Sequence, residues 1–121
     1  MATISRIVLS ASTDGRPIEV AATGTAGTTI HTGTTTTDDY HEIWLWASNH
    51  NTSAEVLVLE WGGTTPTDDR ITTTIQPNET VLVAPGWMLK GNSGGALIVR
   101  AYSTTTNKVN IIGHVNLIDA A

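Results

Sequence analysis

Turn-forming residues recur at short intervals along the whole chain and leave only short segments between them. Asp-Gly, Gly-Gly, Pro-Asn and Pro-Gly pairs stand at 14–15, 62–63, 77–78 and 85–86, and glycine-containing turns lie at 24, 27, 33 and 91–95. The intervening segments are rich in Thr, Val and Ile, which favour extended strands. No window has the 3.6-residue apolar period of an amphipathic helix. The sequence therefore predicts an all-β protein built from short strands.

Nine segments have the length and composition of strands. They cover residues 4–9, 18–22, 28–32, 42–47, 55–61, 71–75, 80–84, 96–102 and 109–118. In the last segment Val109, Ile111 and Val115 alternate with His114 and Asn116, which is typical of a sheet with one dry face and one wetter face. We predict that the mostly apolar segment 80–84 is a central strand.

Many short strands joined by polar turns predict a single-domain antiparallel β-sandwich, with a jelly roll as the expected version. We assign residues 17–121 to the sandwich and residues 1–16 to an N-terminal arm or edge strand. As an arm, this segment could be disordered when free and pair with the sheet edge of a neighbouring subunit; the alternative is an ordinary first strand. Because an isolated sandwich leaves strand edges exposed, we expect a homo-oligomer.

Composition excludes several classes of function. The chain has 121 residues and a net charge of −5, and its six Lys and Arg are scattered singly. We therefore expect no nucleic-acid or membrane partner, since phosphate groups are bound by clustered cations. The absence of cysteine excludes disulfides, zinc–thiolate sites and cysteine catalysis. With no clear export signal and no long apolar run, synthesis in the cytosol is expected.

The segment GNSGG, residues 91–95, resembles the surround of the nucleophilic serine in trypsin-like proteases. His41, Asp69 (or Asp68) and Ser93 also follow the chain order of that catalytic triad. However, Asp69 and Ser93 are close in sequence, and a chain of this length has material for one sandwich, not for two barrels. We therefore predict that the protein is not an enzyme.

A glycine-rich turn explains the same segment without catalysis. Gly91, Gly94 and Gly95 suit backbone conformations with positive φ, and Asn92-Ser93 is typical of such turns. On this interpretation the three glycines should resist replacement by valine, and Ser93→Ala should have little effect.

Four possible metal ligands, His31, Asp38, Asp39 and His41, fall within eleven residues. Imidazole and carboxylate groups could together hold a divalent cation. The alternative is a surface loop whose carboxylates are solvated or bond backbone N–H groups. Because the spacing matches no known ligand pattern, we expect no metal and no cofactor.

The tryptophans are the most informative large side chains. Trp44 and Trp46 lie on one face of their strand, and Ile43 and Leu45 lie on the other. The strand is therefore central, or one of its faces meets a partner. Buried tryptophans commonly anchor cores and interfaces, although an exposed pair could instead form a platform for a sugar ring. His114, on the polar face of the last strand, is either an interface contact or a solvated residue.

Four segments carry a resemblance that covers nearly the whole chain. They are DGRPIEVAATGTAGTTIHT at 14–32, HEIWLWASN at 41–49, VLEWGGTT at 58–65, and LIVRAYSTTTNKVNIIGHVNLI at 97–118. Together they resemble small virion proteins of tailed bacteriophages, of the capsid decoration (cement) type. The resemblance implies a β-rich trimer on the outside of the phage head, at joints between major capsid subunits.

From the residues and this resemblance we expect a non-enzymatic structural virion protein that binds the outer capsid surface and stabilises it. The expected partners are the major capsid protein and further copies of the chain in a homotrimer. The alternative is a glycan- or receptor-binding module of a head fibre or tail. Candidate contact residues are Ile4, Arg6, Ile7, Val8, Leu9, Arg16, Trp44, Trp46, Trp87 and His114.

Overall fold

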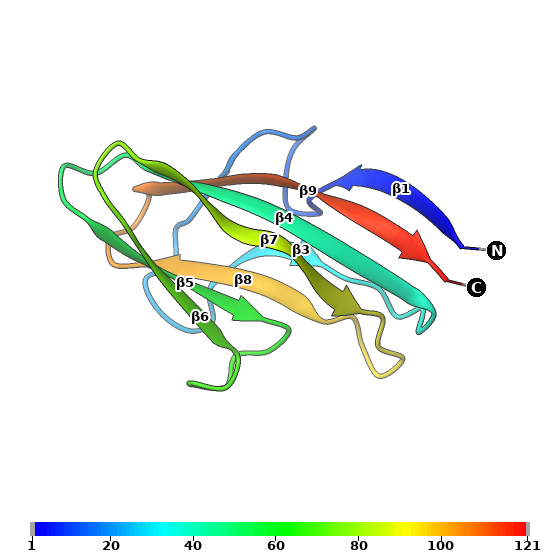
Figure 1. Ribbon diagram of the computed structural model, residues 1–121. Helices are drawn as coiled ribbons and strands as arrows, with labels where there is room; N and C mark the ends of the chain where they lie inside the picture. Colours follow the sequence, from blue (N-terminus) through cyan, green and yellow to red (C-terminus); the bar gives the residue numbers. More distant parts are fainter. Residues whose placement is uncertain (1, 121) are drawn as a thin grey trace.

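The computed structural model describes residues 2–120, and in this part the chain forms nine strands and no helix (Figure 1). The strands are β1 (Thr3–Val8), β2 (Ile18–Glu19), β3 (Thr28–Thr32), β4 (Asp39–Asn49), β5 (Glu55–Trp61), β6 (Arg70–Ile75), β7 (Thr80–Lys90), β8 (Ile98–Ser103) and β9 (Val109–Asp119). The all-β prediction is confirmed. None of the described residues belongs to a helix that could cross a membrane.

The strands form two antiparallel sheets that pack face to face. The five-stranded sheet has the order β1-β9-β4-β7, with the short β2 also paired to β9, and the four-stranded sheet has the order β3-β8-β5-β6. Figure 1 shows β4 and β9 in one layer and β5, β6 and β8 in the other. This order, in which the chain passes repeatedly between the sheets, is that of a jelly roll. The predicted β-sandwich is therefore confirmed.

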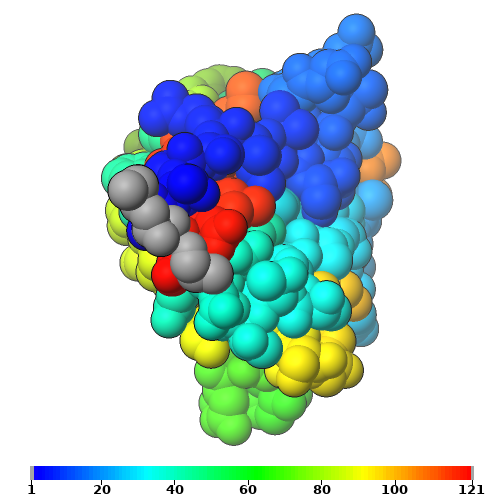
Figure 2. Space-filling model, turned by 90° about the vertical axis from the view of Figure 1, so that its right-hand side faces the viewer, coloured from blue at the N-terminus to red at the C-terminus, as the bar shows by residue number. Residues whose placement is uncertain are grey.

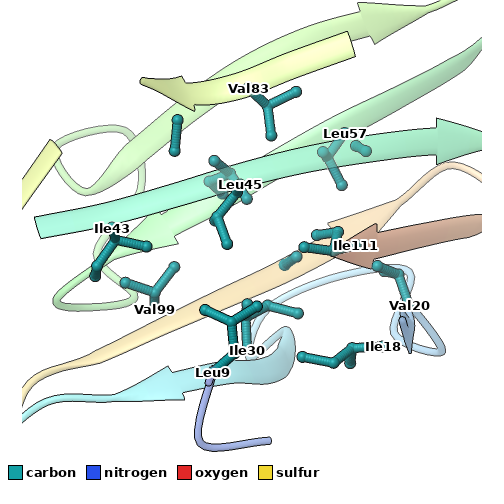
Figure 3. Packing of buried hydrophobic residues seen from close by; sticks show 14 of the residues in the cluster. Leu9, Ile18, Val20, Ile30, Ile43, Leu45, Leu57, Val83, Val99 and Ile111 are labelled. Carbon is teal, nitrogen blue, oxygen red and sulfur yellow. The ribbon is translucent and has the colours of Figure 1, made fainter. Parts of the chain in front are cut away.

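Period-two alternation decides which side chains enter the core. Ile43, Leu45 and Ala47 on β4 are fully buried, whereas Trp44 and Trp46 point outward and are half-buried. Figure 3 shows Ile43 and Leu45 beside side chains of the other sheet. The core also contains Leu9, Ile18, Val20, Ile30, Leu57, Leu59, Ile75, Val83, Val99, Val109, Ile111 and Val115. Each large apolar side chain buried here contributes roughly 1.5–3 kcal/mol of transfer free energy.

The position of β7 differs from the prediction. The strand lies at the edge of the five-stranded sheet, so the prediction of a central strand is wrong. It also runs straight through Pro85-Gly86, where a turn was expected, with register shifts against β4 on this stretch. Such irregularities place the consecutive residues Val83 and Ala84 both in the core, which produces the apolar run. Proline lacks the N–H that an inner strand would need, so Pro85 suits an edge strand.

The N-terminal segment forms part of the sandwich in this structure. β1 pairs with the end of β9 as an edge strand, from Thr3 opposite Asp119 to Val8 opposite His114. Figure 2 shows the N-terminal strand, in blue, beside the C-terminal strand, in red. Directly after β1 the chain turns inward, and Leu9 is 1% exposed in the core.

Two buried glutamates fasten loops onto the sandwich. Glu60 is fully buried because the loop before β3 crosses it: Gly27 N–H donates to Oε1 at 2.7 Å and the Thr25 hydroxyl to Oε2 at 2.8 Å. Glu55, 1% exposed, accepts from Asn51 Nδ2 at 3.0 Å and from Thr105 N–H at 2.8 Å. Burial alone raises the pKa of Glu55, but these hydrogen bonds together outweigh it and lower the pKa. Both carboxylates therefore act as loop anchors.

Candidate binding face

The outward side of the five-stranded sheet carries most of the exposed large apolar side chains. Of the six large hydrophobic side chains that are exposed among the described residues, five lie on this side: Ile4, Val8, Leu82, Met88 and Ile112. Strand register puts them there, because Trp46 stands between Leu82 and Ile112 on the neighbouring strands, and His114 stands between Trp44 and Val8. We call these five residues together with Trp44, Trp46 and His114 the outer face. Exposed apolar side chains gathered on one side of a protein often mark an interaction site.

A shallow hollow of about 310 Å³ lies on the outer face, lined by Arg6, Glu42, Trp44, Trp46, His114 and Asn116. Three of these residues contribute aromatic rings, and the Trp44 ring is close to parallel with the other two, which are tilted by 34° to each other. The Trp44 and Trp46 rings lie 6.3 Å apart at 22°, and the His114 ring lies 6.4 Å from Trp44 at 17°. The hollow therefore has an aromatic side.

Hydrogen bonds between side chains fix the polar side of the hollow. Arg6 Nε donates to Asn116 Oδ1 at 3.3 Å, and Asn116 Nδ2 donates to Glu42 Oε1 at 2.9 Å. The Trp44 indole N–H donates to the same Glu42 oxygen at 2.8 Å. The bonds from Trp44 and Asn116 lower the pKa of Glu42, and burial with the nearby Arg6 charge lowers that of His114. At neutral pH Glu42 is therefore charged and His114 is neutral.

Gly86 on β7 makes room for the Trp44 indole. A Cβ atom at position 86 would lie 2.8 Å from Trp44 Cζ2 and 3.0 Å from Cε2, and the backbone there has a φ of +75°. Only glycine adopts this conformation without strain and leaves space for the ring. The outer face thus depends on a glycine that sequence inspection assigned to a turn.

Six of the ten candidate contact residues share the outer face or its hollow: Ile4, Arg6, Val8, Trp44, Trp46 and His114. The other four lie elsewhere. Ile7 packs against the core, Leu9 is inside it, and Arg16 is exposed in the turn before β2. Trp87 packs against the core and meets Trp61 edge to face, with ring centroids 5.6 Å apart at 83°.

The three residues that match the order of a protease triad lie in separate surroundings. Ser93 is exposed in the turn between β7 and β8. His41 is 4% exposed and its Nδ1 atom lies 2.7 Å from His31 Nε2. Asp69 accepts a hydrogen bond from the Thr65 N–H at 3.0 Å. No hydrogen bond among the described residues joins any two of them.

Ser93→Ala should change the free energy of unfolding by less than about 0.5 kcal/mol, because an exposed side chain without a core contact is removed. Urea denaturation measures this, and a fluorophosphonate probe should leave Ser93 unmodified. Stoichiometric labelling of Ser93 would contradict the non-enzymatic interpretation.

The glycines around Ser93 differ from one another. A Cβ atom at Gly91 would collide with the carbonyl oxygen of Thr36, and Gly95 has a φ of +145°, so both should resist substitution. At Gly94 a Cβ atom would meet nothing closer than 3.9 Å. The expectation that Gly94 also resists valine is therefore not supported by its surroundings.

The possible metal ligands do not converge. Within residues 2–120 there is no group of three or more His, Asp or Glu side chains placed to hold a metal ion. Instead His31 and His41 form a buried pair, a contact that sequence inspection missed. A signal existed, since His41 alternates in phase with Ile43 and Leu45 and so had to face the core.

No protein-family model matches the chain, and a search of curated proteins finds no significantly similar sequence. The class of protein defined by the structure is thus a single-domain β-sandwich with one apolar outer face.

Proposed function

We propose that the chain is a non-enzymatic structural protein of a phage virion, which decorates the outer surface of the head between major capsid subunits. The observation that carries this proposal is the outer face, where apolar side chains gather on one side of a sandwich that is otherwise rich in threonine. A face of this kind is typically covered by a macromolecular partner. The sequence resemblance supplies the identity of that partner and the expected homotrimer.

The geometry suits attachment through non-covalent contacts alone, without a catalysed reaction. Trp44 and Trp46 are large aromatic side chains of the type that dominates interface energetics, and Arg6 and Glu42 provide polar groups beside them. A protein that binds only the assembled shell stabilises it by mass action. Repetition over many symmetric copies makes the total effect large even when each contact is weak.

Adding the purified chain to undecorated heads should raise their melting temperature, and an aspartate on the outer face should weaken binding. We expect Ile112→Asp to reduce affinity at least tenfold, about 1.4 kcal/mol, since it places a charge in an apolar contact. Val56→Asp is the matched control, because Val56 is similarly exposed (40% against 44%) on the outside of the other sheet. Absence of stabilisation, or equal losses in both variants, would refute attachment through the outer face.

The hollow supports a second candidate, a glycan-binding module of a head fibre or tail. Its aromatic rings and the hydrogen-bonded Arg6–Asn116–Glu42 chain combine an apolar platform with a few oriented polar groups, as small-molecule sites do. On a glycan array this candidate requires specific retention that is abolished by Trp44→Ala and kept by Trp87→Ala, because Trp87 lies outside the hollow. An array without retention, together with intact binding to heads, would leave decoration as the function.

A further inference from the structure

A chain of hydrogen bonds runs through two buried histidines that come from different sheets. The Ser10 backbone N–H donates to His31 Nδ1 at 3.0 Å, and His31 Nε2 lies 2.7 Å from His41 Nδ1. His31 on β3 is 1% exposed and His41 on β4 is 4% exposed. The pair therefore bridges the four-stranded and the five-stranded sheet inside the sandwich.

The protonation state of both rings follows from their partners. A backbone N–H can only donate, so His31 Nδ1 accepts from Ser10 and the ring proton is on Nε2. That proton is donated to His41 Nδ1, which leaves the second proton on His41 Nε2. Both links are satisfied only while both rings are neutral.

The same contacts hold the segment that follows β1. Ser10 is bonded twice, since its Oγ atom also accepts from the Thr32 N–H at 2.6 Å. Ala11 N–H donates to the Ile30 carbonyl at 3.3 Å, and Leu9 is buried in the core. The segment 9–11 is thus tied to β3 on both sides of His31.

We propose that the His31–His41 pair is an acid-sensitive latch, which holds segment 9–11 against β3 at neutral pH and releases it on acidification. A proton added to His31 turns Nδ1 into a donor that faces the Ser10 N–H. A proton added to His41 puts a donor opposite the Nε2–H of His31. Either event breaks one link and leaves a buried cation. This inference goes beyond the proposed function and does not depend on it.

The surroundings give the added proton little compensation. On the strands that flank the pair, the residues opposite it are the apolar Leu89 of β7, Leu117 of β9 and Val99 of β8. The charged group that acts on the pair is Asp39 of β4, which favours a protonated His41. However, Asp39 Oδ1 and His41 Nε2 are each buried without a hydrogen-bond partner, so the two groups are not bonded to each other.

These surroundings set the pH window of release. Burial, with a smaller contribution from His41, lowers the pKa of His31 to about 4, and burial lowers the pKa of His41 more than Asp39 raises it. A released His31 has an ordinary pKa near 6.5, so the open state binds protons first. The closed state is therefore fully stable above about pH 6.5 and loses stability as the pH falls towards 4.

Hydrogen exchange followed by NMR tests the latch on the whole chain. After correction for intrinsic rates, the exchange of the Ser10 and Thr32 amides should rise roughly 30-fold between pH 7.5 and pH 5.0, the factor that the His31 pKa change implies by linkage. Amides in the middle of β4 and β9 should stay protected over this range. If all amides lose protection together, the domain unfolds as a whole and local release is refuted.

His31→Asn is the decisive variant, because its Oδ1 atom can accept from Ser10 but cannot be protonated in this pH range. It should lose most of the increase in exchange, whereas His114→Asn, which removes an outer-face histidine, should keep it. If His31→Asn does not fold, ring ¹⁵N shifts of the wild type decide the matter. They should show an unprotonated His31 Nδ1 at pH 7.5 and its protonation in step with release of Ser10. Equal acid response in His31→Asn and wild type, or release without ring protonation, would overturn the latch.

Discussion

Replacing Gly113 by alanine is expected to lower the free energy of unfolding by about 3 kcal/mol. Gly113 lies on β9 opposite Leu45 of β4, directly before the stretch of β9 that also pairs with β1. A Cβ atom there would collide with the carbonyl oxygen of Trp44, which is backbone and cannot swing aside as a side chain can. The two strands would have to separate in the middle of the sheet, directly beneath the outer face.

Urea denaturation measures the loss, and Gly24→Ala is the matched control. A Cβ atom at Gly24 would meet no atom within 4 Å, so this variant should stay within about 0.5 kcal/mol of the wild type. Equal midpoints for the two variants would show that β4 and β9 do not approach each other as closely as described.

Replacing Glu60 by alanine is expected to lower the free energy of unfolding by about 2–4 kcal/mol and to release the loop before β3. The carboxylate is fully buried and accepts from Gly27 and Thr25, whose donors would be left without it. Arg70, which bonds Thr25 at 3.0 Å and lies 5.6 Å from the Tyr102 ring centre, would lose part of its support. The outside of the four-stranded sheet would then open to water.

Equilibrium unfolding gives the size of the Glu60 effect, and hydrogen exchange at Gly27 gives its location. Glu60→Gln should lower the free energy of unfolding less, since its amide oxygen still accepts one of the two hydrogen bonds. Glu19→Ala removes the same charge from an exposed position on β2 and should be nearly neutral. Unchanged protection of Gly27 in Glu60→Ala would contradict the anchoring role.

The strands that could be predicted from the sequence are those in which pairing with neighbouring strands leaves the inward–outward alternation of side chains regular. β5 has the predicted bounds, and β9 has the predicted inward set of Val109, Ile111 and Val115. The position of β7 could not be predicted in this way, because a bulged stretch places successive residues on one face and breaks the two-residue alternation. Pro85 was the local sign of an edge strand, but proline also marks turns.

The candidate site was also predictable only in part, because strand pairing decides which residues join it. That Trp44 and Trp46 share a face follows from the two-residue period of a strand, whatever the strand pairs with. That Arg6 and His114 join them depends on β9 lying between β1 and β4, which no local pattern specifies. The Gly86 contact with Trp44 depends equally on the pairing of β4 with β7.

The sequence, through local backbone geometry, thus determines the all-β class and the direction in which each regular strand presents its side chains. The choice of strand neighbours was settled by burial over the whole chain, because pairing partners distant in sequence are selected by the core they jointly enclose. The outer face, the His31–His41 pair and the burial of Glu60 all depend on that choice. They belong to the tertiary structure because each joins strands or loops that are distant in sequence and meet only when the strands have paired into sheets or the sheets have packed together.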